Sequence, residues 1–255
     1  MSPRLLDRLG SPRSMRIAVL SDIHGNLTAL EAVLSDLRDQ SPDLIYHGGD
    51  LADGGSSPVE VFDRIRDLGW PGVLGNTDEM LIRPKSLEEF AAQSKAPSAL
   101  WDTVREIAAA TRAALGEERL AWLRTLPISV HRPGFALVHA SPISCWCAPA
   151  STATDAGLEA IYSVLCEPIV AYGHTHLPSI RNLPGTPKLL INTGSVGLPY
   201  DGDPRASYLL LDNDRPTIRR VACDIEKELK LLAASGLPGA AWTAKMLRAS
   251  APTMP

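Results

Sequence analysis

The chain has 255 residues, of which 45% are hydrophobic and 21% are charged, a balance typical of a globular protein with one large core. Its net charge of −4 leaves no basic excess for the backbone of a nucleic acid duplex, so we expect no extended nucleic acid binding. No apolar run approaches the roughly 18 residues of a membrane span, and no Cys-x-x-Cys pair occurs, so we expect no membrane partner and a cytoplasmic location.

The two ends of the chain differ from its middle. Residues 1–14 are basic but lack the apolar stretch of a secretory signal, and we expect a flexible leader there. We expect residues 15–250 to form a single domain and residues 251–255, which contain proline, to fray.

Predicted strands and helices alternate in the first part of this domain. An apolar run over 16–20 predicts a buried strand, and leucine and valine at helical spacing predict a helix over 27–40. A second strand over 43–49 and a helix that begins near Pro58 follow, and the residues 72–74 predict a third strand. This order is typical of an α/β fold.

The pattern becomes helical from about residue 81 to 126, with breaks at Pro84, Pro97 and Gly116. This segment carries no cluster of residues that bind metals. We therefore interpret 81–126 as a helical insertion that flanks a site formed elsewhere.

The second half of the chain returns to short strands. Strands are predicted over 128–131, 135–138 and 169–172, and a helix over 152–166. Three more strands have hairpin-like spacing and predict a second, partly antiparallel sheet: 188–191, 206–211 and 217–221. Two helices, over 225–234 and 238–248, close the chain.

Side chains that can bind metal ions follow five of the predicted strands. They are Asp22, His24, Asp50, Asn76, His139, His174 and His176. Because ligands of open α/β sheets bind beyond the carboxyl ends of the strands, we expect these side chains to converge. Seven ligands exceed the needs of one tetrahedral ion, and a pair of ions requires a shared carboxylate, for which Asp50 is our candidate.

The ligand types indicate which ions and which substrate to expect. Oxygen and imidazole ligands suit divalent manganese, iron, nickel or zinc, and we expect two manganese ions first. Two divalent ions bring four positive charges, of which Asp22 and Asp50 remove two and a bridging hydroxide one. The remaining positive charge suits a phosphoryl group, and the bridging hydroxide is a nucleophile for direct attack on phosphorus.

The ordered set of motifs resembles that of the calcineurin-like metallophosphoesterase superfamily. The motifs are Asp22-Ile-His24, Gly49-Asp50, Gly75-Asn76, His139 and Gly173-His-Thr-His176. The segments 191–197 and 203–208 resemble the small bacterial phosphodiesterase branch of that family. The resemblance implies a four-layer α/β/β/α sandwich, in which two mixed sheets are flanked by helices.

The resemblance also implies how the ligands are shared. One ion would be held by Asp22, His24, Asp50 and His176. The other would be held by Asp50, Asn76, His139 and His174. We assign catalytic roles to Asp50, Asn76 and His139.

One position departs from the family pattern. Many members carry a histidine after the Gly-Asn pair, where it is thought to protonate the leaving oxygen, and this chain has Thr77. A threonine hydroxyl is too weak an acid for that role. We therefore expect substrates with good leaving groups, such as aryl esters or the phosphoanhydrides of nucleotides.

The sequence thus predicts a dinuclear metal-dependent phosphoesterase that cleaves phosphodiester or nucleotide phosphoanhydride bonds in a small phosphorylated substrate. The alternatives are a phosphomonoesterase that acts on a phosphoprotein or nucleotide, and a non-catalytic interaction scaffold, as in the retromer subunit that shares this fold. The sequence does not predict the oligomeric state.

For several polar residues, the sequence leaves two interpretations open. Asp78 either hydrogen-bonds near the site or caps the following turn, and Arg205 either clamps a substrate phosphate or forms a structural salt bridge. Residues 192–195 either support the histidine loop or form a tight strand exit. We expect Asp53 to lie in a loop and His47 to have a core or supporting role.

Overall fold

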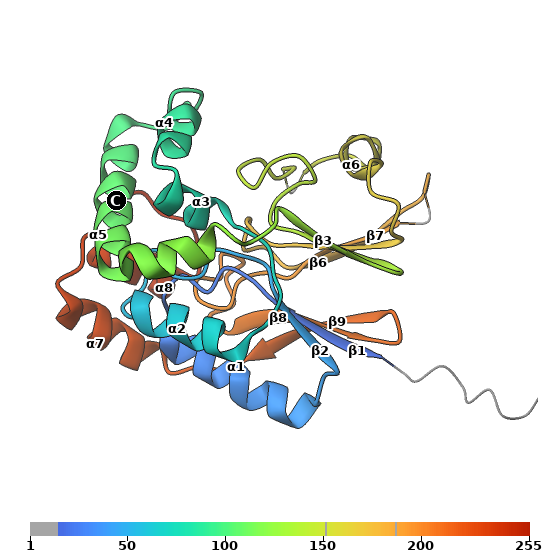
Figure 1. Ribbon diagram of the computed structural model, residues 1–255, viewed down its shortest axis with the longest axis horizontal. Helices are drawn as coiled ribbons and strands as arrows, with labels where there is room; N and C mark the ends of the chain where they lie inside the picture. The colour runs from blue at the N-terminus through green and yellow to red at the C-terminus, as the bar shows by residue number, and fades with distance from the viewer. Residues whose placement is uncertain (1–14, 151, 187) are drawn as a thin grey trace, which may run out of the picture.

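The computed structural model describes residues 15–150, 152–186 and 188–255, so the expected leader, 1–14, lies outside the described residues. Two mixed sheets face each other in the centre of the molecule (Figure 1). One sheet has four strands in the order β2-β1-β8-β9: Leu44–His47, Arg16–Leu20, Ala206–Asp212 and Arg215–Val221. The other has five, in the order β3-β4-β5-β7-β6: Ser129–Arg132, Phe135–Val138, Ile169–Tyr172, Lys188–Asn192 and Ser179–Leu183.

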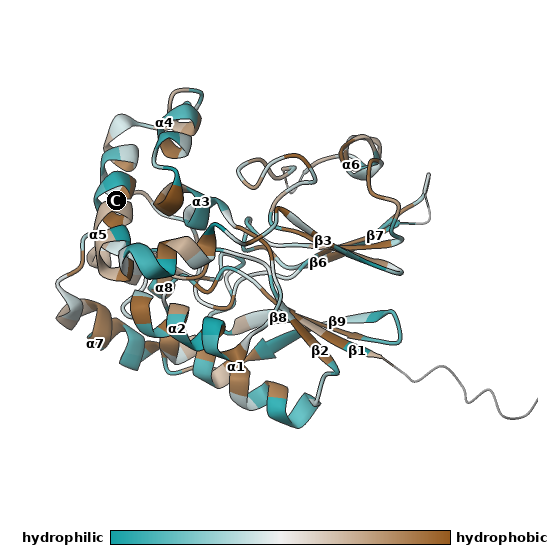
Figure 2. Ribbon diagram, in the orientation of Figure 1, coloured by the Kyte–Doolittle hydropathy of each residue, from teal (hydrophilic) through white to brown (hydrophobic). Residues whose placement is uncertain are grey.

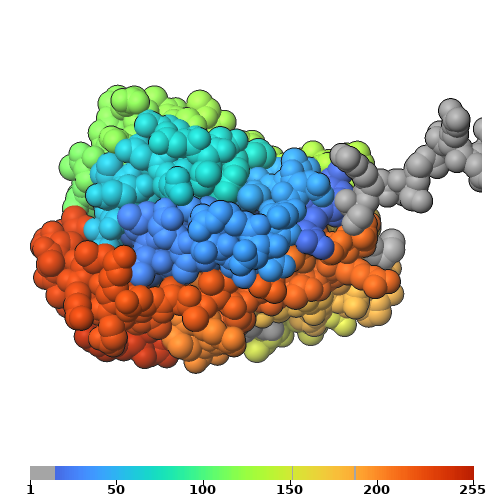
Figure 3. Space-filling model, turned by 90° about the horizontal axis from the view of Figure 1, so that it is seen from below, coloured from blue at the N-terminus to red at the C-terminus, as the bar shows by residue number. Residues whose placement is uncertain are grey.

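Helices cover the outer faces of both sheets. The four-stranded sheet carries α1 (Leu27–Gln40) and α2 (Pro58–Leu68), with α7 (Ile225–Ser235) beside α1. Figure 3 shows the molecule from the side of these helices, where α1 near the N-terminus (blue) lies next to the C-terminal part of the chain (orange and red), which includes α7. The five-stranded sheet carries α6 (Asp155–Tyr162). The predicted α/β/β/α sandwich is therefore confirmed.

Alternate residues of each inner strand point to opposite faces of the sheet and so belong to different layers of the core. In β1, Ile17 and Val19 point between the sheets, whereas Ala18 and Leu20 pack under the helices. Strand β4 repeats this division, with its alternate residues facing the other sheet or α6. The inner strands β1 and β4 are buried along nearly their whole length, and Figure 2 shows hydrophobic residues in brown on β1 and β2 and teal residues on the outer sides of α1 and α2.

The stretch predicted as a helical insertion, 81–126, contains the end of α3 (Asn76–Ile82) and all of α4 (Lys85–Ala91) and α5 (Ser98–Leu123). Pro84 and Pro97 precede α4 and α5, and Gly116, at φ 68°, divides α5. The last helix, α8 (Ala240–Ala249), lies at the same end of the molecule (Figure 1). Residues 251–255 run back along α8, where the carbonyl of Thr253 accepts a hydrogen bond from Trp242.

Two predictions about the strands were wrong. The last three predicted strands do not share a sheet: β7 joins β5 and β6, whereas β8 pairs antiparallel with β1. The segment 72–74 forms only an isolated bridge, between Gly72 and His47. Among the described residues, no helix combines the length and apolarity needed to cross a bilayer.

Candidate metal centre

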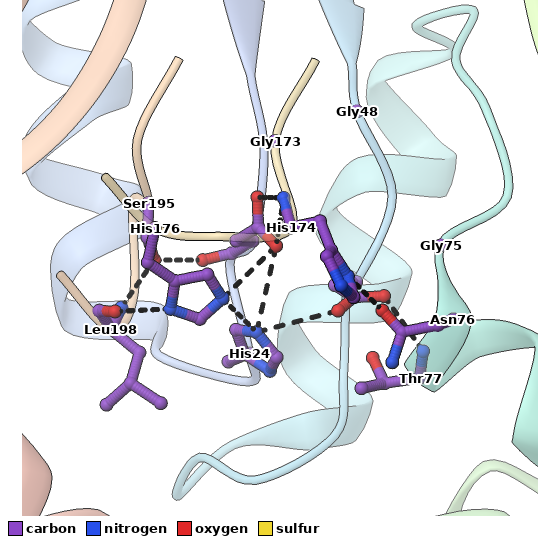
Figure 4. Close-up of polar contacts among 12 residues, drawn as sticks. His24, Gly48, Gly75, Asn76, Thr77, Gly173, His174, His176, Ser195 and Leu198 are labelled. Carbon is purple, nitrogen blue, oxygen red and sulfur yellow. Dashed lines mark hydrogen bonds and ion pairs between the residues drawn. The ribbon is translucent and has the colours of Figure 1, made fainter. Parts of the chain in front are cut away.

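All seven predicted ligand residues lie at one end of the sheets. Figure 4 labels four of them: His24, Asn76, His174 and His176. Asp22 and His24 follow β1, Asp50 follows β2, and His139 follows β4 directly. His174 and His176 follow β5, and Asn76 is the first residue of α3. The fold therefore brings together residues that are up to 154 positions apart, because parallel neighbours deliver their carboxyl ends to the same edge.

The backbone of this end of the sheets is strained. Five of the seven residues have a left-handed φ, between 49° and 65°: Asp22, His24, Asp50, His174 and His176. Residues other than glycine adopt this region rarely, at a cost of order 1 kcal/mol or more each, and such strain is concentrated at functional sites.

The ring nitrogens of His24 and His176 are placed so that they could share one cation. The Nδ1 atoms donate to the carbonyls of Asp53 and Leu198, at 2.8 and 2.6 Å. In the neutral rings, each Nε2 then carries a lone pair, and these two atoms lie 3.1 Å apart. Two nitrogens bound to one ion at ~2.0–2.1 Å are separated by roughly 3.0–3.4 Å, so the pair fits a shared metal.

A second group surrounds Asn76. His139 donates from Nδ1 to the carbonyl of Gly48 at 2.7 Å, and its Nε2 lies 3.0 Å from the Asn76 Oδ1. The Nδ1 of His174 lies 2.8 Å from the same oxygen. The Nε2 of His139, the Nδ1 of His174 and the Asn76 Oδ1 thus converge on one point, and the bond from His139 to Gly48 is of the kind that orients metal-bound histidines.

Asp50 lies between the two groups. One of its oxygens is 3.7 Å from the Nε2 of His24, and the other is 3.5 Å from the Nε2 of His139. Asp22 lies 3.2 Å from the Nε2 of His176 and also accepts the backbone N–H of His174 at 3.0 Å. Two sets of three ligand atoms can each hold an ion: Asp22, His24 and His176, and Asp22, Asp50 and His139.

At Asp22, His24 and His174, the electrostatics favour the protonation states that metal ligands need. Burial alone would raise the pKa of Asp22, but His176 beside it holds that pKa well below its usual range. Burial and the neighbouring histidines lower the pKa of His24, and that of His174 to about 4, so both rings are neutral. His139 differs, because Asp50 and Asp22 outweigh burial and raise its pKa.

Asp78 braces the loop that carries Asp50. Its buried carboxylate accepts the backbone N–H groups of Asp50, Leu51 and Gly75, at 2.7, 3.0 and 3.1 Å. Burial, with Asp50 nearby, raises the pKa of Asp78 to about 6. Gly75 is required here because a Cβ at that position would lie 2.0 Å from the Asp50 Oδ1. Both interpretations of Asp78 are therefore correct, since its carboxylate bonds beside the site and also caps the start of α3 through the N–H of Gly75.

The segment 192–195 supports the histidine loop. Asn192 donates to the carbonyl of Gly173 at 2.8 Å and Ser195 donates to that of Asp22 at 2.7 Å. Arg205 instead pairs with Asp203 at 2.7 Å and is half-exposed, so it forms a structural salt bridge.

Some residues that orient the predicted ligands could not be predicted from the sequence, because they act through their backbone carbonyl groups. The carbonyls of Gly48 and Leu198 orient His139 and His176, and no side-chain pattern signals them. Asp53 also orients His24 through its carbonyl, while burial raises the pKa of its carboxyl group to about 7. Tyr200 stacks on His176, with ring centroids 4.4 Å apart.

Comparisons with known proteins agree with this geometry. Residues 15–215 match the model of the calcineurin-like phosphoesterase superfamily domain. An uncharacterized protein of Methanocaldococcus jannaschii is 30% identical over 249 residues, which cover 87% of this chain and 93% of that protein. A symmetrical bis(5'-nucleosyl)-tetraphosphatase of Aromatoleum aromaticum is 30% identical over 152 residues, and the match covers 58% of this chain and 52% of that protein.

A solved structure extends the similarity over most of the chain. The metallophosphoesterase from Sphaerobacter thermophilus superposes with a TM-score of 0.74 and 29% identity, covering 92% of this chain and 100% of that one. The two sheets, the converging ligands and these relatives lead to one assignment. The chain belongs to the calcineurin-like phosphoesterase superfamily, whose members are metal-dependent.

Proposed function

We propose that this protein is a dinuclear metal-dependent phosphoesterase that hydrolyses phosphodiester or nucleotide phosphoanhydride bonds. The observation that carries the proposal is the convergence of seven ligand side chains, with the His24 and His176 nitrogens 3.1 Å apart. Tetraphosphatase-named relatives support a hydrolase with a small nucleotide substrate.

Each candidate ion has a defined set of side chains. The first would be held by Asp22, His24, Asp50 and His176. The second would be held by Asp50, Asn76, His139 and His174. When bound, the two ions would lower the pKa of a coordinated water and polarise the phosphoryl group. We expect manganese first, and iron, nickel or zinc are the other candidates for these ligand types.

The chain's own residues keep this machinery in position. Asp50 reaches both groups, and the N–H of Thr77 donates to its Oδ1 at 2.9 Å. Asn76 and His139 are the residues we assign to orientation of the phosphoryl group. The catalytic roles of Asp50, Asn76 and His139 belong to this proposal.

Leaving-group protonation limits the choice of substrates. The Thr77 hydroxyl oxygen is buried without a hydrogen-bond partner, and a hydroxyl is a weak general acid. Esters with good leaving groups should therefore react fastest. The four cysteines are free, which is consistent with the cytoplasmic location that we propose.

The test is a metal panel followed by a substrate panel. The protein is prepared with manganese, iron, nickel or zinc and given bis-p-nitrophenyl phosphate, a dialkyl phosphodiester, a dinucleoside tetraphosphate and phosphomonoesters. We expect hydrolysis of the aryl diester and little of the dialkyl ester, with a gain on the latter in Thr77→His. Preference for monoesters would favour a phosphomonoesterase, and an inert protein with two bound ions would favour a scaffold.

A further inference from the structure

A cavity of about 230 Å³ opens beside the candidate metal centre. His24, Asn76 and His174 line the cavity and also belong to the predicted ligand set. The other walls come from α3, α4, α5, α8 and the loop around Trp146. Figure 1 shows these helices gathered at the end of the sheets where the ligand loops lie. A group attached to a bound phosphoryl centre would therefore enter this cavity.

The walls of the cavity are mainly apolar and aromatic. Three of the chain's five tryptophans line it, together with Phe90 and Tyr200. Phe90 packs edge-on against Trp101 at a centroid distance of 5.8 Å and lies 5.0 Å from Trp146. Rings in these arrangements offer a flat partner offset-stacked or edge-to-face contacts.

Three of the four polar groups on these rings are bound elsewhere, and the fourth, the buried indole N–H of Trp101, has no hydrogen-bond partner. The indole N–H of Trp146 donates to Glu79 at 2.5 Å, and that of Trp242 donates to the carbonyl of Thr253 at 2.7 Å. The Tyr200 hydroxyl contacts the sulfur of Met246 at 3.3 Å. Trp146, Trp242 and Tyr200 therefore present hydrophobic surface, and among the described rings that line the cavity only Trp101 keeps a free N–H donor.

The cavity has no basic residue to receive additional phosphates. Among the described residues that line it, none is lysine or arginine, and one is the carboxyl-bearing Asp53. The nearby arginines of the insertion are already paired: Arg83 with Glu79 and Glu89, and Arg105 with Glu88 and Asp102. A chain of anionic phosphates would lose its hydration here without gaining a partner.

We propose that the substrate has a single phosphoryl centre and carries a flat, uncharged aromatic group that binds in this cavity. This proposal rests on the proposed function and selects aromatic phosphoesters over the polyphosphate substrates that the tetraphosphatase-named relatives suggest. The aromatic group would contact Phe90, Trp101 and Trp146 while its phosphoryl group faces the ligand loops.

The test compares phenylphosphonate with methylphosphonate, two probes that share the phosphonate group and differ in the ring. Calorimetric titration of the manganese-loaded protein measures their affinities without turnover. We expect phenylphosphonate to bind at least tenfold more tightly, which corresponds to about 1.4 kcal/mol. Phe90→Ala and Trp101→Ala should reduce this ratio to less than about threefold.

Matched variants distinguish a specific loss of binding in the cavity from a general effect of substitution on the fold. Trp70 is half-buried and does not line the cavity, so Trp70→Leu should keep the full ratio. Val104→Asn keeps every aromatic ring and places an amide in the wall, and it should also lower the ratio. Equal affinity of the two phosphonates, or no binding of phenylphosphonate, overturns the proposal.

A hydrolysis assay distinguishes this proposal from the function on which it rests. A tenfold binding ratio without hydrolysis of bis-p-nitrophenyl phosphate would reject the enzyme and retain the aromatic site. Hydrolysis with equal phosphonate affinities would reject the aromatic site alone. A higher kcat/KM for diadenosine tetraphosphate than for thymidine 5'-p-nitrophenyl phosphate would also contradict the choice of a single phosphoryl centre.

Discussion

The buried histidine His47 should make the protein sensitive to mild acid. Its ring is fully buried, and neither nitrogen has a hydrogen-bond partner. Trp122 lies on one side, at a centroid distance of 6.0 Å, and a Cβ on Gly72 would approach the ring to 2.3 Å. Burial therefore lowers the pKa of His47 from 6.5 to about 4, because no group compensates a charge there.

The sign and size of the effect follow from this pKa. Between pH 6.5 and about 4, the unfolded chain binds a proton at His47 and the folded protein does not, so stability falls as the pH falls. At about 1.4 kcal/mol for each pH unit, the shift from 6.5 to about 4 lowers the free energy of unfolding by roughly 3 kcal/mol.

Urea denaturation with EDTA present measures this loss without a contribution from bound metal. His47→Phe keeps a flat ring that cannot titrate, and it breaks no hydrogen bond. We expect the wild type to become about 3 kcal/mol less stable relative to this variant when the pH is lowered from 7 to 4. A stability difference that stays the same at both pH values would refute the reasoning.

Three further variants test the candidate metal centre. Asp50→Ala should reduce the metal content measured by elemental analysis from two ions to one or none, and it should lower the rate of hydrolysis at least about 100-fold. Full activity of this variant would contradict the shared role of Asp50. Gly75→Ala places a Cβ 2.0 Å from the Asp50 Oδ1, so we expect weaker metal binding in calorimetry, whereas Gly69→Ala, where nothing lies within 4 Å, should bind metal normally. Asp78→Ala leaves three buried N–H groups without their acceptor and should cost about 2–4 kcal/mol in urea denaturation; a loss below about 1 kcal/mol would mean that water replaces the carboxylate.

The sequence was most informative about the strands that carry ligands. Apolar runs that stop at Asp22, Asp50 and His139 marked both the strands and the edge where their ends meet. Periodicity does not say which strands pair, however, and the strand 206–212 joined β1 rather than β7. Its residues are buried on both faces, so either sheet could have accepted them.

The surroundings of the site depend on contacts that no local pattern encodes. The carbonyls that orient the histidines carry no side-chain signal, and Asp78 acts through three backbone groups from two separate loops. The same holds for the aromatic cavity. Phe90 and Trp101 lie on different helices, and Trp146 lies in a loop. Helical spacing predicts an apolar face without showing that it faces the predicted ligands.

The left-handed backbone at the predicted ligands has a consequence for how cations are captured. Since the loops already hold these uncommon dihedral angles, arriving ions do not have to distort the chain, and the conformational work is done once, during folding. In the metal centre that we propose, relief of the lone-pair repulsion between His24 and His176 would add to the affinity for the ion. On this proposal, the protein gives up part of its stability to keep a rigid, preorganised metal site.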